Sequence, residues 1–202
     1  MNYEHYMLGV RERLERLVST LTARGYLFQH PLETMGMPGA EADRQLGHLE
    51  KRVGIIPAAL AAFWRNVGSV DLTGRHPEWT GCDYPDSLLV YSVDAALSEA
   101  NEYLELDDPA TEYWASASGV FRAPIAPDKL HKENVSGGMW YGVEIPNASD
   151  DPIVLEEGHD LPFTEYLEFA LRWGGFPGLE HVADHTWPLN ELRIAAGRRT
   201  RG

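Results

Sequence analysis

The clearest pattern of hydrophobic and polar positions lies in residues 161–178, LPFTEYLEFALRWGGFPG. Apolar side chains recur there at spacings of three and four residues, which places them on one face of a helix. These residues are Phe163, Tyr166, Leu167, Ala170 and Trp173. Gly174 and Gly175 offer the positive φ angles with which many helices end, and Pro177 prevents continuation of the helix. The pattern predicts an amphipathic core helix with no catalytic role.

Three earlier segments repeat apolar residues with the same helical spacing. They cover residues 4–24, 40–53 and 55–67, and they are followed by Gly25, Gly54 and Gly68. Glycine is common just beyond a helix end because it adopts positive φ angles without a steric cost. Asp94 is a favourable N-cap for a fourth helix over residues 95–104. A short last helix is predicted over residues 189–196.

Short apolar or alternating segments between these helices predict strands. The segments are residues 26–28, 69–72, 88–93, 120–125, 139–145 and 153–155. Pro124 lacks the backbone N–H that a central strand needs, so its segment is expected at a sheet edge or a strand end. Helices that precede strands, with one more helix to close the fold, favour a single α+β domain. We expect it to contain a mixed, mostly antiparallel sheet flanked by helices.

The chain length fits one domain with a single core, and we assign residues 1–202 to it. Residues 1–40 are predicted to form an N-terminal extension of one helix and a loop. Residues 179–202 are predicted to form a C-terminal tail. Its last residues, 197–202 (GRRTRG), are expected to be disordered because they are polar and terminal.

The charge of the chain is strongly negative and unevenly distributed. Its formal net charge is −14, but residues 76–171 alone hold 20 acidic and three basic residues, a net charge of −17. A field of this sign repels nucleic acids and anionic membranes and attracts basic proteins or cations. We therefore expect a protein partner with a basic surface, and neither nucleic acid nor a membrane as a partner.

Cysteine content and the absence of targeting signals bear on the compartment. Cys82 is the only cysteine, so no disulfide can form within the chain. No apolar run approaches the length of a membrane span. The N-terminal segment MNYEHYMLGVRERLERL is amphipathic and charged, unlike a signal peptide. These features lead us to expect a cytoplasmic protein.

The sequence lacks the motifs that carry common catalytic and metal-binding chemistry. HExxH, paired cysteines, GxSxG, GxxxxGK[ST] and GxGxxG are all absent. His181 and His185 are spaced like neighbours on one helix face, with Asp184 beside them, but surface histidines are the simpler interpretation. We therefore expect no catalytic residue, no metal site and no cofactor.

The densest mixed group of polar side chains lies in the predicted loop 126–138. It consists of Asp128, His131, Lys132, Glu133 and Asn134. A hydrogen-bonded loop over the sheet edge is the simpler interpretation. The alternative is an enzyme of unfamiliar type centred on this loop, which would require a cleft beside it.

Residues 49–74, LEKRVGIIPAALAAFWRNVGSVDLTG, resemble the signature of the SUKH superfamily, the Smi–Knr-type domain. In that pattern an acidic helix ends at a glycine, a proline opens the next helix, and an aromatic pair leads to a glycine and a short strand. The matching residues are Glu50, Gly54, Pro57, Phe63, Trp64 and Gly68. Residues 125–146 and 163–178 resemble the later segments of one bacterial subgroup of this superfamily.

The resemblance implies an α+β fold with a mixed sheet flanked by helices and no catalytic residues. Most bacterial members of the superfamily are thought of as immunity proteins, which bind and neutralise a toxin made by the same cell. Other members are regulatory scaffolds. Our first hypothesis is an immunity protein that occludes a basic toxin domain, such as a nuclease. The alternative is a regulatory or scaffold module that binds an endogenous protein without neutralising a toxin.

The acidic middle of the chain is the predicted partner-binding surface, because acidic side chains can mimic the polyanion that a basic cleft binds. The acidic residues are Glu78, Asp83, Asp86, Glu99, Glu102, Glu105, Asp107, Asp108 and Glu112. The aromatic anchors are Trp79, Tyr84 and Trp114.

Overall fold

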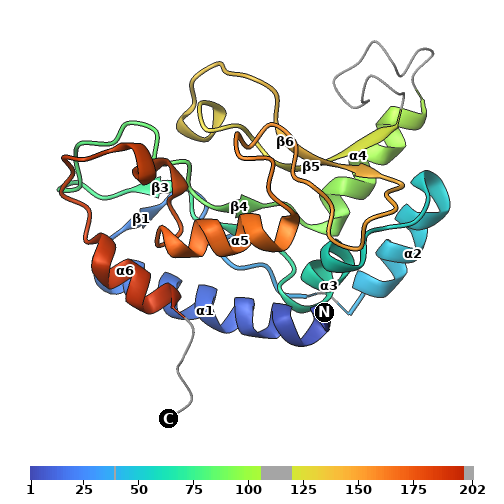
Figure 1. Cartoon of the computed structure of the whole chain (residues 1–202), viewed down its shortest axis with the longest axis horizontal. Helices are drawn as coiled ribbons and strands as arrows, with labels where there is room; N and C mark the ends of the chain where they lie inside the picture. The colour runs from blue at the N-terminus through green and yellow to red at the C-terminus, as the bar shows by residue number, and fades with distance from the viewer. Residues whose placement is uncertain (39, 106–119, 198–202) are drawn as a thin grey trace.

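Helix α1 (Tyr3–Ala23) is the longest helix of the computed structural model, which describes residues 1–38, 40–105 and 120–197 (Figure 1). The side chain of Asn2 caps it by accepting a hydrogen bond from the backbone N–H of His5 at 3.1 Å. The buried apolar stripe consists of Met7, Val10, Leu14, Leu17 and Leu21. Gly25 follows with a φ angle of +84°, so both the predicted helix and its end signal are confirmed.

Helices α2 (Ala42–Val53) and α3 (Ala58–Asn66) confirm the next two predicted helices. Helix α3 packs against α1, and α2 packs against α4 (Val93–Leu104). Trp64 is buried on α3, and its indole N–H donates to the carbonyl of Tyr91 at 2.9 Å. This hydrogen bond ties the helical part of the core to the segment that precedes α4.

The strands form three antiparallel pairs in the part of the chain that the structure describes. They are β1 (Leu27–Phe28) with β3 (Gly74–Arg75), β2 (Val70–Asp71) with β4 (Leu89–Val90), and β5 (Phe121–Ala126) with β6 (Tyr141–Ile145). A backbone hydrogen bond of 2.8 Å from Tyr91 to Ile125 links the second pair to the third. The α+β class is confirmed, and its sheet consists of short antiparallel pairs between helices.

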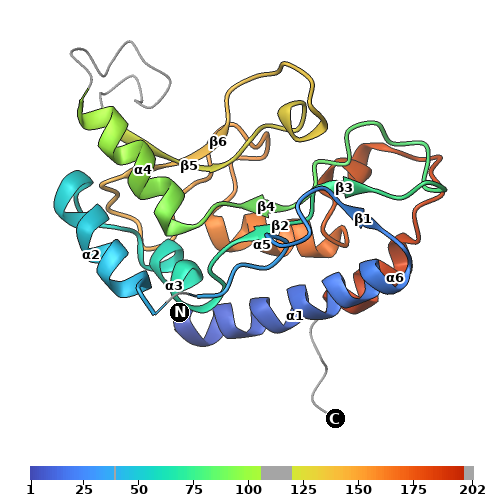
Figure 2. The same cartoon turned by 180° about the vertical axis from the view of Figure 1, so that it is seen from behind.

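Strand β5 is buried along its whole length, and α4 packs on it (Figures 1 and 2). Pro124 lies opposite Gly142 of β6, and the register shifts directly after it. A proline at an irregular position of a two-stranded sheet agrees with the predicted edge location, because its missing N–H is not needed there.

Helix α5 (Phe163–Arg172) is the amphipathic helix that the sequence predicts. It packs against α1, α3, α6 (Leu189–Ala196) and the 3₁₀ helix η3 (Pro177–His181). The ring of Phe163 meets Phe63 of α3 edge-on at a centroid distance of 5.5 Å, and Tyr166 meets Tyr141 of β6 edge-on at 6.5 Å. Its aromatic face therefore joins the helical layer to the third pair of strands.

The end of α5 packs tightly against the core, at the predicted glycine pair. Gly174 and Gly175 have φ angles of +64° and +90°. A Cβ atom on Gly175 would lie 2.7 Å from a methyl group of Leu72 and 2.9 Å from a methyl group of Leu17. Glycine is required here by both the backbone conformation and the space.

Helix α4 begins earlier than predicted, and Asp94 is not its N-cap. Ser92 occupies the N-cap position in extended backbone, and its hydroxyl accepts a hydrogen bond from the N–H of Ala95 at 3.4 Å. Asp94 lies within the first turn and accepts a hydrogen bond from Gln45 of α2 at 2.8 Å. The prediction was wrong because an N-cap needs non-helical backbone, which Ser92 has and Asp94 lacks.

The C-terminal part contains helix α6, which confirms the predicted last helix and packs beside α1 (Figure 1). The expected disorder of residues 197–202 concerns a segment that, from residue 198 onward, lies outside the described residues. Within the described ranges, no helix combines the length and the apolar character that crossing a membrane requires.

Candidate functional site

A cleft of ≈ 740 Å³ lies between the loop after β5, the turn before α5, and η3. Its lining residues come from the segments 84–86, 128–130, 138–141, 156–159, 166–169 and 177–181. Five of them are carboxylates, namely Asp86, Asp128, Glu156, Glu157 and Glu180, and one is a lysine, Lys129. The cleft is therefore acidic, with histidine and aromatic side chains between the carboxylates.

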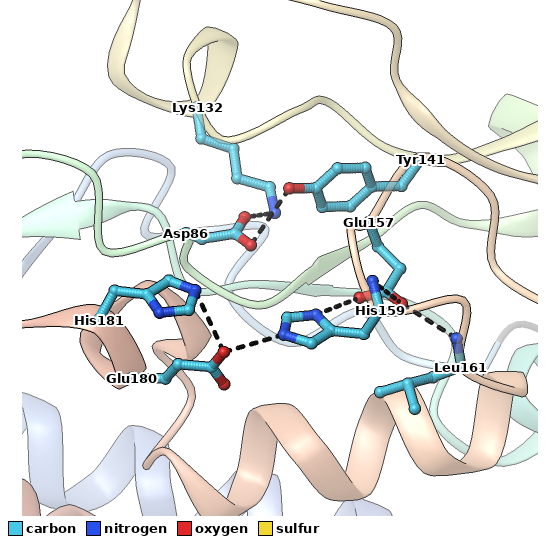
Figure 3. A network of polar contacts seen from close by, with 8 residues as sticks. All are labelled: Asp86, Lys132, Tyr141, Glu157, His159, Leu161, Glu180 and His181. Atoms are coloured by element: carbon cyan, nitrogen blue, oxygen red, sulfur yellow. Dashed lines mark hydrogen bonds and ion pairs between the residues drawn. The ribbon is translucent and has the colours of Figure 1, made fainter.

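A buried ion pair between Asp86 and Lys132 lies at this cleft (Figure 3). Lys132 Nζ donates to Asp86 Oδ1 at 2.6 Å, and the Lys132 side chain is 0% exposed. The hydroxyl of Tyr141 donates to the other carboxylate oxygen at 3.2 Å. Burial and the charge of Asp86 raise the pKa of Tyr141 far above its usual value, so its hydroxyl remains a donor.

A cluster of two histidines and two glutamates borders the same cleft (Figure 3). Buried Glu157 accepts hydrogen bonds from the backbone N–H groups of His159 and Leu161 at 2.9 and 3.0 Å. Its other oxygen lies 3.1 Å from His159 Nδ1. Glu180 Oε1 lies 3.0 Å from His159 Nε2 and 3.1 Å from His181 Nε2. One carboxylate oxygen thus faces two imidazole nitrogens.

The turn over residues 156–160 positions this cluster. Glu156, Gly158 and Asp160 all have positive φ angles, which reverse the chain sharply around Glu157 and His159. Burial lowers the pKa of His159, but its hydrogen bonds to Glu180 and Glu157 outweigh burial, so the pKa lies above the usual value. The turn therefore holds a histidine between two carboxylates.

The aromatic wall of the cleft comes from α5. Tyr166 is 2% exposed, and its hydroxyl has no hydrogen-bond partner among the described residues. Phe169, one turn later, packs against the ring of His159 at a centroid distance of 4.5 Å. A buried hydroxyl is normally hydrogen-bonded, so the hydroxyl of Tyr166 is an exception in this core.

The loop 126–138 also borders the cleft, through Asp128, Lys129 and Leu130. Asp128 accepts a hydrogen bond from the backbone N–H of Leu130 at 2.9 Å, and its other carboxylate oxygen pairs with the ring of His131. Burial raises the pKa of Asp128, but these hydrogen bonds outweigh burial and hold it below the usual value. The loop is hydrogen-bonded as expected, and a cleft does lie beside it, so the requirement of the enzyme alternative is met.

Two of the predicted binding residues lie at this cleft. Tyr84 lines it and is 40% exposed, whereas Asp86 is buried against Lys132. Glu78 and Asp83, which precede them in the chain, are exposed.

The predicted anchor Trp79 is partly buried in an aromatic group beside β1 and β3. Its ring stacks on His76 at 4.4 Å and lies 5.1 Å from Trp187 and 5.6 Å from Tyr26. Its ring therefore already contacts aromatic side chains of the chain itself, whereas Tyr84 is exposed.

The remaining predicted residues lie elsewhere in the chain. Glu99 and Glu102 lie on α4, and Glu105 is its C-cap residue. Helix α4 lies at the opposite end of the molecule from β3 in both views (Figures 1 and 2). Glu102 and Glu105 are exposed, and Glu99 is half-buried. The predictions for Asp107, Asp108, Glu112 and Trp114 fall outside the described residues. The predicted acids thus occupy at least two separate surfaces.

The histidine and glutamate cluster was not found by the sequence reasoning. His181 was considered only with His185, but residues 181–185 do not form a helix, and His181 faces Glu180 instead. Glu157 and His159 come from a turn more than 20 residues earlier. The dense polar run EEGHD at residues 156–160 is the signal that could have drawn attention to it.

Comparison with known proteins found no match to the chain among family models, curated proteins or solved structures. The resemblance to the SUKH superfamily therefore stays a prediction.

Proposed function

We propose that this chain is a non-enzymatic, protein-binding module of the immunity type, which binds and neutralises a basic toxin domain of a bacterial cell. The observation that supports it best is the cleft of ≈ 740 Å³ whose lining holds five carboxylates and one lysine. A cleft with this charge favours basic side chains of a partner over anionic ligands. The resemblance to the SUKH superfamily supports the same function.

Exposed side chains beside the cleft suit an encounter with a basic surface. Tyr84 is a partly exposed aromatic residue at the cleft, and Tyr is among the residues that contribute most to binding energy at interfaces. Asp83 next to it and Asp160 next to His159 are exposed. Glu156 and Glu180 line the same cleft as Tyr84, so an arginine of the partner that enters the cleft would meet negative charge.

The long-range field of the chain adds to this local complementarity. A net charge of −14 attracts a basic partner before contact and raises the association rate at low salt. Because exposed charges are screened within about 8 Å at physiological ionic strength, this effect must fall as salt is added.

Co-expression tests the neutralisation directly. The gene next to the one that encodes this chain would be expressed with and without it, and growth and complex formation would be measured. We expect the neighbouring product to arrest growth alone, and the pair to grow and to co-purify. A stable complex without rescue of growth would favour a regulatory or scaffold module instead.

Charge-neutralising variants test which surface binds. Asp83→Asn with Asp160→Asn removes two negative charges beside the cleft, and Glu102→Gln with Glu105→Gln removes two from the end of α4. We expect the first pair to lower the association rate at low salt by about threefold or more and the second pair to have a smaller effect. Stopped-flow kinetics at several salt concentrations measures both. Equal rates for all three proteins would contradict binding at an acidic surface.

A further inference from the structure

We propose that His159, Glu180 and His181 bind a divalent transition-metal cation of the Zn²⁺ type at the edge of the cleft. One nitrogen of each histidine and a carboxylate oxygen of Glu180 all lie within 4.8 Å of one another. This site goes beyond the protein-binding function and does not depend on it.

The distances within the cluster suit a four-coordinate ion. Zn²⁺ binds its nitrogen and oxygen ligands at about 2.0–2.1 Å, which places two ligands of a tetrahedral ion about 3.3 Å apart. Glu180 Oε1 lies 3.0 Å from His159 Nε2 and 3.1 Å from His181 Nε2. The His181 side chain is 75% exposed, so it is free to rotate and complete the site.

Glu157 orients His159 in the way that carboxylates orient metal-binding histidines. Its oxygen lies 3.1 Å from Nδ1 of His159, which directs Nε2 toward Glu180 and His181 (Figure 3). Glu157 itself is buried and fixed by two backbone N–H groups. A histidine whose second nitrogen donates to a held carboxylate is a stronger and better-positioned ligand.

The ligand set selects among cations. Two imidazoles and one carboxylate suit Zn²⁺ and its neighbours, whereas Mg²⁺ and Ca²⁺ prefer oxygen ligands. Three protein ligands leave one position of a four-coordinate ion open to water or to another ligand.

The contacts of His159 with Glu157 and Glu180 have one competing explanation, a doubly protonated ring, and the experiment must distinguish it from a metal site. A neutral imidazole donates from only one nitrogen, so without an ion His159 must be doubly protonated to donate to both Glu157 and Glu180. A metal ion replaces the second proton, and the first hydrogen bond remains. A histidinium has no free lone pair at Nε2, so Zn²⁺ must displace that proton in order to bind His159.

Calorimetric titration of the metal-free, untagged full chain with ZnCl₂ tests the proposal, with MgCl₂ as the comparison cation. We expect one equivalent of Zn²⁺ to bind, and Mg²⁺ not to compete. At a free concentration about 100-fold above the dissociation constant, Zn²⁺ should raise the Tm by about 5–10 °C. Replacement of Zn²⁺ by Co²⁺ should give the visible absorption of a four-coordinate ion.

Three single variants make the test specific to the cluster. Glu180→Gln and His181→Gln should each weaken Zn²⁺ binding by about tenfold or more. His48→Gln is the matched control, because His48 is an exposed histidine on α2, away from the cluster. Absence of saturable binding, or equal affinity in all four proteins, would overturn the proposal. Circular dichroism would verify that the variants are folded.

Discussion

At the scale of single residues, Asp86 illustrates how burial changes the role of an acidic side chain. The sequence placed it among the acids of a binding surface, next to exposed Asp83 and Tyr84. In the structure it pairs with Lys132, which lies 46 positions later in the chain. Local sequence around an acid does not reveal whether a lysine from a distant loop reaches it. The acids of the segment 78–86 therefore divide into exposed and paired residues only in the folded chain.

The ion pair between Asp86 and Lys132 predicts that Lys132→Met strongly lowers the stability of the fold. The substitution removes the buried ammonium and leaves the carboxylate of Asp86 without its charged partner. We expect the free energy of unfolding to fall by about 3–5 kcal/mol, since an isolated buried charge is costly. Urea denaturation measures this change.

Two further variants separate the loss of the ion pair from other effects of Lys132→Met. The double variant Asp86→Asn with Lys132→Met removes both charges and should recover most of the lost stability. Lys129→Met changes an exposed lysine of the same loop and should alter stability by about 0.5 kcal/mol or less. If the double variant were no more stable than Lys132→Met, the unpaired charge would not be the cause.

At the scale of elements, helices were easier to predict than strands. Helix α1 repeats its buried positions over 21 residues and is followed by a glycine, so its pattern is long and redundant. Strands β1, β2 and β4 lie within the predicted segments 26–28, 69–72 and 88–93, but each is only two residues long, and β3 was not predicted. Their pairing depends on contacts between distant segments, and sequence alone cannot identify the partner of so short a strand.

The start of α4 gives an element-scale prediction. Ser92→Ala removes the N-cap hydroxyl and should lower the free energy of unfolding by about 1 kcal/mol. Asp94→Ala loses a solvent-exposed hydrogen bond from Gln45 and a favourable charge in the first turn, so a loss of about 0.5 kcal/mol is expected. Ser98→Ala, at an exposed position within the same helix, is the control. A larger loss for Asp94→Ala than for Ser92→Ala would mean that Asp94 contributes more than the cap.

At the scale of the whole molecule, the candidate site could not be predicted because six separate segments line it. The sequence does predict an excess of acids in residues 76–171, and it does predict the helix α5 that carries Tyr166. It does not predict that the turn around His159 meets the 3₁₀ helix around Glu180, because neither segment has a periodic pattern. Net charge is available from composition, whereas the position of a cleft requires the fold.

The net charge also predicts how the stability of the whole molecule responds to salt. At neutral pH the formal charge is −14, so the acidic side chains repel one another. Raising NaCl from about 10 to 150 mM shortens the Debye length from roughly 30 to 8 Å and screens this repulsion. Partly buried pairs such as Arg13–Glu168 are screened less than the exposed acids. We therefore expect the Tm at pH 7.5 to rise by about 2–5 °C over this range. Near the isoelectric point, at pI ≈ 4.9, the rise should vanish because the net charge is close to zero. Calorimetric scans at both pH values measure this, and a Tm that falls with salt at pH 7.5 would mean that ion pairs outweigh the repulsion.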